Sequence, residues 1–126
     1  MDMLLWFLNN RNKVFKILFF LSIVVVLIIT QTPNIKIEQK IDNQDKIHHF
    51  ITFFILFIQG FLAYKKLFKI ALFLFLYGII IELLQAFLPF NRTADREDIL
   101  ANMLGIGLAY FVIRLIMLKS QAKKLT

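Results

Sequence analysis

Four apolar stretches, each close to the length that crosses a lipid bilayer, constrain the fold of this chain more than any other feature. In chain order they are Val14–Thr30, Ile47–Tyr64, Phe68–Leu88 and Ile99–Leu118. A helix of about 20 predominantly apolar residues spans the hydrocarbon core. The chain has 126 residues, 60% of them hydrophobic, and a mean hydropathy of +0.74, which leaves too little polar material to cover a soluble core. The sequence therefore predicts one all-α domain, an integral membrane four-helix bundle.

The basic residues predict the orientation of these spans. One group lies at the start of the first span, between the second and third, and after the fourth: Arg11, Lys13, Lys16, Lys65, Lys66, Lys69, Lys119, Lys123 and Lys124. The other connections, 31–46 and 89–98, mix basic residues with six acidic ones. Because cytoplasmic loops carry an excess of Lys and Arg, we expect both termini in the cytoplasm and these two connections outside.

Composition also excludes several classes of protein. The net charge of +7 would suggest nucleic acid in a soluble protein. Here the basic residues flank the apolar stretches as anchors, so we expect membrane lipids as partners and no nucleic acid. The chain has no cysteine, which excludes disulfides, thiolate metal sites and a cysteine nucleophile.

The N-terminal region has the outline of a signal peptide, with basic residues before an apolar stretch. Residues 28–33 offer no small-x-small cleavage site, so we expect a retained span. The preceding apolar segment, Met3–Leu8, is too short to cross the bilayer and is expected to lie in the membrane interface.

A small group of polar side chains inside the predicted spans forms the candidate site. At about 1.5 Å per residue, Glu82 lies about 9 Å and Gln85 about 5 Å below the outer end of the third span. His49 and Asn102 lie at comparably shallow depths in the second and fourth spans. These residues come from three helices but occupy one layer. Charged residues form the rim above it: Asp45, Lys46, Arg92 and Asp98.

Glu82 is the strongest single candidate. A carboxylate that faces lipid is costly, so an intramembrane acid faces the bundle interior and has a partner. It could donate or accept a proton, or it could only form a structural ion pair with Arg92 or Lys46. His49 is a candidate base and Asp98 a candidate to orient its partner. Asp98 would also favour the dipole in the first turn of a helix.

No metal site or cofactor is predicted. His49, Glu82 and Asp98 offer one imidazole and two carboxylates, but the sequence has no HExxH-like spacing. His48 points about 100° away from His49 on a helix, so the two rings cannot easily share a site. Asn102 could equally serve helix packing. Small residues at helical spacing near it would let backbones approach closely: Gly78, Gly105 and Ala109.

Three blocks of residues follow one another in a recognisable order. Asp45–Phe50 reads DKxxHF, and Glu82–Gln85 reads ExxQ. A third block, of the form P…R…D…AN..G, consists of Pro89, Arg92, Asp98, Ala101, Asn102 and Gly105. From Asp45 to about Gly105 the chain resembles the VanZ-like family, small bacterial membrane proteins related to a teicoplanin-resistance protein.

The resemblance implies a four-span protein of the bacterial cytoplasmic membrane, with the matched polar residues as its site. Members are linked to glycopeptide tolerance. The leading hypothesis is an outward-facing polar pocket that binds an amphiphilic cell-envelope ligand, lipid-linked or glycopeptide-like. The alternatives are an intramembrane acid/base enzyme that acts on a lipid-linked substrate, and a structural or assembly protein. The sequence leaves the oligomeric state open.

Overall fold

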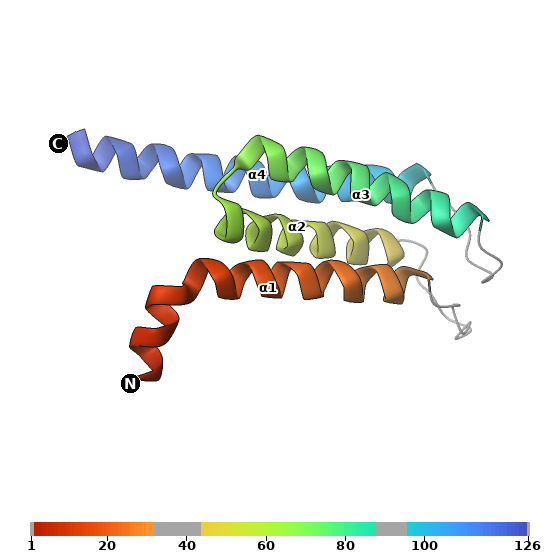
Figure 1. Ribbon diagram of the computed structural model, residues 1–126. Helices are drawn as coiled ribbons and strands as arrows, with labels where there is room; N and C mark the ends of the chain where they lie inside the picture. The colour runs from red at the N-terminus through yellow and green to blue at the C-terminus, as the bar shows by residue number, and fades with distance from the viewer. Residues whose placement is uncertain (1, 32–43, 88–95, 126) are drawn as a thin grey trace.

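The computed structural model describes residues 2–31, 44–87 and 96–125, which form four helices (Figure 1). The helices are α1 (Met3–Gln31), α2 (Gln44–Tyr64), α3 (Leu67–Phe87) and α4 (Arg96–Leu125). All four are long and apolar enough to cross a membrane, by length and composition. The prediction of an all-α membrane bundle of four helices is confirmed.

Helix α1 begins at Met3, so the short apolar segment Met3–Leu8 is helical and continuous with the first span. The Asp2 Oδ1 atom accepts a hydrogen bond of 3.2 Å from the backbone N–H of Leu4, which caps the helix start. No Pro or Gly interrupts α1. Figure 1 shows its first turns at a steep angle to the rest of the helix, turned away from the bundle.

A tight turn joins α2 to α3. Lys65 has φ of 57°, the left-handed conformation that often ends a helix, and its N–H donates to the Phe61 carbonyl at 2.7 Å. Because α3 begins at Leu67, the two helices must run antiparallel side by side.

The core lies where α2 and α3 meet the other helices. Each of these two helices contacts all three others, whereas α1 and α4 make no contact with each other within the described residues. The largest apolar side chains that are almost completely enclosed are Phe53, Leu56, Phe57, Leu74 and Ile81. They belong to α2 and α3, and their packing holds these two helices at the centre of the bundle.

The lateral surface of the bundle, which points away from its core, is apolar. Phe19 is the one buried residue of α1, while Phe20, Ile28 and Ile29 are each more than 60% exposed. A surface of this kind suits lipid, in which exposed apolar side chains cost nothing.

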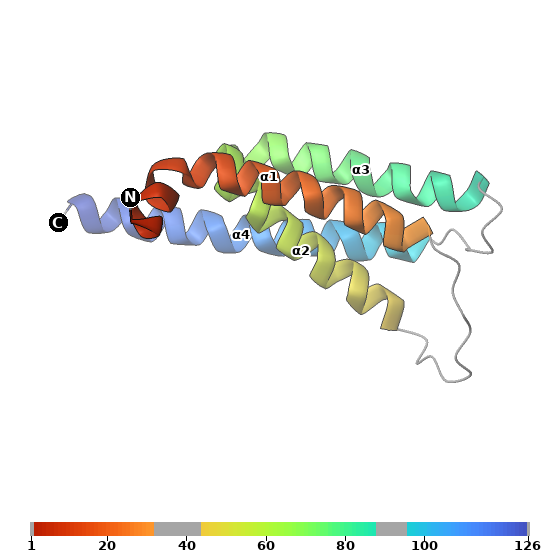
Figure 2. The same cartoon turned by 60° about the horizontal axis from the view of Figure 1, so that its bottom comes forward.

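The helix ends fall into two groups. Figures 1 and 2 show both described ends of the chain, and the α2–α3 turn, at one end of the bundle. The last turns of α1 and α3 and the first turns of α2 and α4 lie at the other end, which we call the site end. The site end is the one that the charge pattern predicts to face outward.

Candidate functional site

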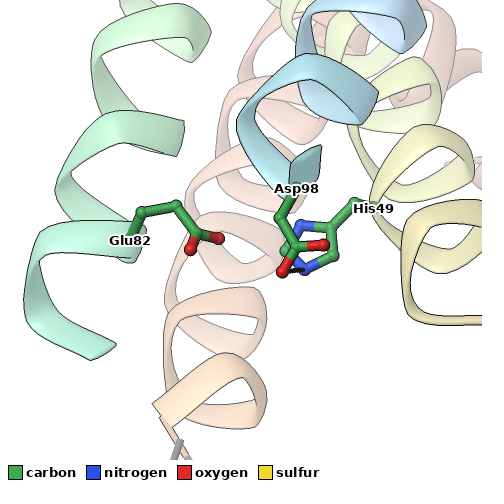
Figure 3. A group of neighbouring side chains, drawn as sticks. All are labelled: His49, Glu82 and Asp98. Carbon is green, nitrogen blue, oxygen red and sulfur yellow. Dashed lines mark ion pairs between the residues drawn. The ribbon is translucent and has the colours of Figure 1, made fainter. Parts of the chain in front are cut away.

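Three ionisable side chains from three different helices converge at the site end (Figure 3). They are His49 on α2, Glu82 on α3 and Asp98 on α4, and one ligand atom from each lies within 4.8 Å of the other two. The His49 Nε2 atom lies 3.5 Å from the Asp98 Oδ2 atom. All three residues are buried, with exposed fractions of 8%, 4% and 8%. We call these three residues and Asn102 the polar cluster.

Asn102 fixes the ring of His49 from the other side. The His49 Nδ1 atom and the Asn102 Oδ1 atom are 2.9 Å apart, and because an amide oxygen only accepts, Nδ1 carries the proton of this hydrogen bond. Asn102 and Asp98 lie one turn apart on α4, so both reach the same ring on α2. The Nε2 atom is therefore the ring nitrogen that faces the Asp98 carboxylate.

Local helix geometry explains why these side chains point inward. The buried residues of α3 recur every three or four positions, and Glu82 lies on that face one turn after Gly78. Asp98 lies in the first turn of α4, where the helix dipole favours a negative charge. His49 lies in the second turn of α2, one turn before the tightly packed Phe53.

An exposed ion pair lies on the rim of the site end. Lys46 contacts Glu97, and their side chains are 31% and 62% exposed. Ion pairs at this degree of exposure contribute little stability. Lys46 was expected at this rim, whereas the sequence analysis gave no role to Glu97. The acidic first turn of α4 is the signal that could have found it.

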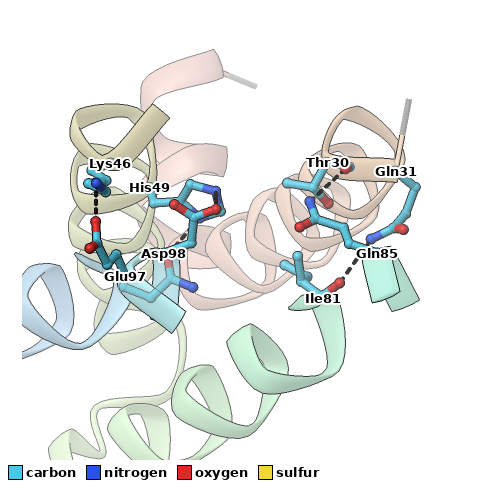
Figure 4. A network of polar contacts seen from close by, with 9 residues as sticks. Thr30, Gln31, Lys46, His49, Ile81, Gln85, Glu97 and Asp98 are labelled. Atoms are coloured by element: carbon cyan, nitrogen blue, oxygen red, sulfur yellow. Dashed lines mark hydrogen bonds and ion pairs between the residues drawn. The ribbon is translucent and has the colours of Figure 1, made fainter. Parts of the chain in front are cut away.

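Gln85 is buried, but it lies outside the polar cluster and contacts α1 from α3 (Figure 4). Its Nε2 atom donates to the Thr30 carbonyl at 2.8 Å, and the Gln31 Nε2 atom donates to the Ile81 carbonyl at 3.3 Å. Two turns before Gln85, the Tyr77 hydroxyl donates to a carbonyl of α1 at 2.6 Å. The sequence analysis missed this α1–α3 seam, although Tyr77, Ile81 and Gln85 at i, i+4 and i+8 could have indicated it.

Two predicted rim residues lie beyond what the structure describes. Arg92 falls within 88–95, outside the described residues, and the side chain of Asp45 is likewise outside them. The structure thus brings together His49, Glu82, Asp98 and Asn102, places Lys46 on the rim, and assigns Gln85 to the seam with α1.

The polar cluster has definite chemical capabilities. An imidazole nitrogen and two carboxylates that face one another in an apolar bundle can share a proton, coordinate a cation or bind the polar part of a ligand. The ring orientation is set by Asn102, so these groups need little rearrangement to act together.

The comparisons with known proteins identify a family for this chain. A family model described as VanZ/LLP1 matches residues 2–117, which include α1 to α3, most of α4 and every residue of the polar cluster. The match extends well beyond the stretch from Asp45 to Gly105 on which the sequence resemblance rests. No curated protein and no solved structure matches the chain significantly.

Proposed function

The chain belongs to the VanZ/LLP1 family, and from this premise we propose that it binds the polar head group of a cell-envelope amphiphile at the site end of its bundle. In this proposal it resides in the bacterial cytoplasmic membrane, with the site end facing outward. The acyl chains of the ligand remain in the bilayer, beside the apolar surface of the helices.

The polar cluster is the observation that carries this proposal. Four of the five buried polar or ionisable residues in the described part of the chain lie together and come from three helices, and the fifth, Gln85, contacts α1. Ionisable residues inside membrane bundles are expensive, and they mark ligand and ion sites more often than structural ones. The cluster lies within the first two turns of α2 and α4 and the last two turns of α3, which in this proposal is close enough to the outer end for a lipid head group to reach.

The groups at the site end suit a head group that carries both charge and hydroxyls. The carboxylates of Glu82 and Asp98 accept hydrogen bonds from hydroxyl or ammonium groups. Lys46 lies on the rim and Arg96 begins α4 at the site end, and Arg92 lies in the sequence between α3 and α4. Such cationic side chains favour a phosphate or carboxylate. A lipid-linked envelope precursor and a glycopeptide-like ligand both offer this combination.

The experiment that tests this proposal measures antibiotic sensitivity. Expression of the chain in a susceptible bacterium should change sensitivity to glycopeptide or lipid-targeting antibiotics. Glu82→Gln and Arg92→Ala should abolish that change, whereas His48→Gln, which alters an exposed neighbour of the site, should retain it. If both site variants insert normally and behave like the parent chain, the head-group site is the wrong interpretation.

A specific contact also favours a second candidate, an intramembrane acid/base enzyme. His49 is held between Asn102 at 2.9 Å and Asp98 at 3.5 Å, an arrangement in which a histidine can transfer protons in a fixed orientation. Mass spectrometry of envelope lipids, with the parent chain and with His49→Gln, separates the two candidates. An altered lipid that depends on His49 supports catalysis, and an unchanged lipid profile contradicts it.

A structural or assembly role makes a different prediction for the same variants. If the polar cluster only locks the helices together, Glu82→Gln should lower the yield of folded protein. Protein that does fold should then act like the parent in the sensitivity assay. The ratio of activity to folded protein in the membrane is the measurement that distinguishes these roles.

A further inference from the structure

We propose that His49, Glu82 and Asp98 together bind one divalent transition-metal ion, with Zn²⁺ or Mn²⁺ as the matching ions. The sequence analysis predicts no metal site, because the three residues lie far apart in the chain and follow no local metal-binding spacing. Their convergence from α2, α3 and α4 is visible only in the folded bundle (Figure 3).

The distances within the polar cluster support a shared cation. The His49 Nε2 and Asp98 Oδ2 atoms are 3.5 Å apart, longer than the range of about 2.7–2.9 Å for a charge-assisted hydrogen bond. Two ligand atoms about 2.1 Å from one zinc ion are about 3.0 Å apart at a right angle and about 3.4 Å apart at the tetrahedral angle. The observed separation therefore fits two ligands of one ion better than a direct hydrogen bond.

The Glu82 carboxylate completes the donor set. One ligand atom from each of the three residues lies within 4.8 Å of the other two, and in this proposal a change of side-chain rotamer on binding closes the remaining distance to the ion. Each donor comes from a separate helix that is already fixed by the core. Such preorganisation lowers the entropic cost of binding.

Asn102 gives His49 the tautomer that a metal ligand needs. Because the His49 Nδ1 atom donates its proton to Asn102 Oδ1, the Nε2 atom can present its lone pair to the carboxylates and a cation between them. Metal-binding histidines almost always donate their second ring N–H in this way, to a partner that holds the ring. Asn102 is only 2% exposed, so this partner is firmly held.

The donor types narrow the identity of the ion. Magnesium and calcium prefer oxygen ligands alone, whereas an imidazole with two carboxylates suits zinc, manganese or iron. The chain has no cysteine, which argues against ions that prefer soft ligands. Zinc and manganese are the two of these ions that can be tested in air without a change of oxidation state.

A second buried polar atom of the cluster lies against α3. The Asn102 Nδ2 atom is buried and has no acceptor among the described residues. A Cβ atom added to Gly78, one turn before Glu82, would lie 3.0 Å from this nitrogen, so the amide is closely packed on α3. Three protein ligands leave at least one coordination position of the ion open, and a head-group oxygen is the ligand that we propose for it. This last step rests on the proposed head-group function, whereas binding of the ion itself does not.

The experiment uses the full chain, purified in detergent, stripped of metal with a chelator and free of added lipid. Binding of Mn²⁺ is measured from the loss of the free-ion signal in electron paramagnetic resonance, and binding of Zn²⁺ from competition with a coloured chelator. We expect one ion per chain with a Kd below about 100 μM. Glu82→Gln and Asp98→Asn should each weaken binding more than about tenfold, and Asn102→Ala by about 10- to 100-fold. His48→Gln, on the neighbouring exposed ring, should bind as the parent does.

Several results would overturn the metal site. One is a parent chain that binds neither ion below millimolar concentration, which requires no variant to fold. Another is undiminished binding by a folded Glu82→Gln or Asp98→Asn variant, and a third is loss of binding in His48→Gln. The two proposals also fail separately. If the ion binds but expression leaves antibiotic sensitivity unchanged, only the head-group function is wrong. If sensitivity depends on Glu82 while no ion binds, only the metal site is wrong.

Discussion

His49 makes both of its side-chain contacts with residues of α4. Asn102 accepts a hydrogen bond of 2.9 Å from one ring nitrogen, and Asp98 lies 3.5 Å from the other. Because His49 is buried, loss of a partner would leave a polar atom of the ring without a hydrogen bond. The ring is therefore held in one orientation by groups that are themselves buried, and Glu82 reaches it from a third helix.

We expect Asn102→Ala to lower the free energy of unfolding by about 1 kcal/mol, because hydrogen bonds between membrane helices contribute on average about 0.6 and at most about 1.7 kcal/mol. The loss follows from a buried His49 N–H that no longer has its acceptor. Thermal unfolding in detergent, followed by circular dichroism, measures the change. Met103→Ala at the adjacent exposed position is the control. Equal stability of Asn102→Ala and the parent would contradict the contact.

The sequence predicted how far along its helix each polar residue lies. It did not predict toward which neighbouring helix each side chain points. Counting residues from the helix ends placed His49, Glu82, Gln85 and Asn102 in one layer, and all four are buried. Gln85 lies three residues after Glu82 and so points about 60° to one side. That angle directs its amide to the Thr30 carbonyl of α1, because α1 covers this side of α3. Which helix packs against each face of another depends on the tertiary structure, and a single sequence does not determine it.

The contact between α2 and α4 depends on one position without a side chain. A Cβ atom at Gly105 would collide with the backbone carbonyl oxygen of Phe50, so the two helices approach one another more closely than any larger residue allows. Gly107, two residues further along α4, has open space around it. Gly107 is therefore a suitable control position for substitution of Gly105 on the same helix.

We expect Gly105→Ala to destabilise the protein by about 1–3 kcal/mol, the usual cost of overpacking a tight contact. Gly107→Ala should change the stability by no more than about 1 kcal/mol, in the stabilising direction, because alanine favours helix over glycine. Chemical denaturation in mixed micelles compares the two variants with the parent. The close packing of α2 on α4 would be wrong if Gly105→Ala were as stable as Gly107→Ala.

The existence and order of the helices were predictable because each apolar stretch has spanning length and the Lys65–Lys66 turn separates two of them. The positions at which the helices begin and end were less predictable. Met3–Leu8 was expected to lie in the membrane interface, and the structure shows that it is helical and continuous with the first span in α1. No residue between it and the first span breaks a helix, so backbone hydrogen bonding simply continues. A bend within a continuous helix leaves no mark in the pattern of apolar residues.

At the scale of the whole molecule, the two ends of the bundle differ in charge. Lys65 and Lys66 occupy the turn between α2 and α3, and Lys123 and Lys124 lie in the last turn of α4 at the same end. The site end carries acidic residues as well as basic ones, including Glu97 and Asp98 in the first turn of α4. The cytoplasmic location of both termini is a prediction from this asymmetry.

The absence of cysteine from the sequence allows a direct test of orientation. Single cysteines introduced as Lys46→Cys, Lys66→Cys, Arg92→Cys and Gln121→Cys are treated with a membrane-impermeant thiol reagent on intact cells. We expect positions 46 and 92 to react, and positions 66 and 121 to react only after permeabilisation. Reaction at 66 but not at 92 would invert the orientation and place the polar cluster at the cytoplasmic face.

The uneven distribution of buried polar groups has a consequence for biosynthesis. Helix α1 precedes the others along the chain and has a single buried residue, so it is stable in lipid as soon as it leaves the translocon. Helix α3 carries Glu82 and Gln85, and the partners of the polar cluster on α4 are not yet synthesised when α3 emerges. We therefore expect α3 to remain beside the insertion machinery until α4 arrives, and a ribosome stalled between the two should leave α3 only loosely inserted.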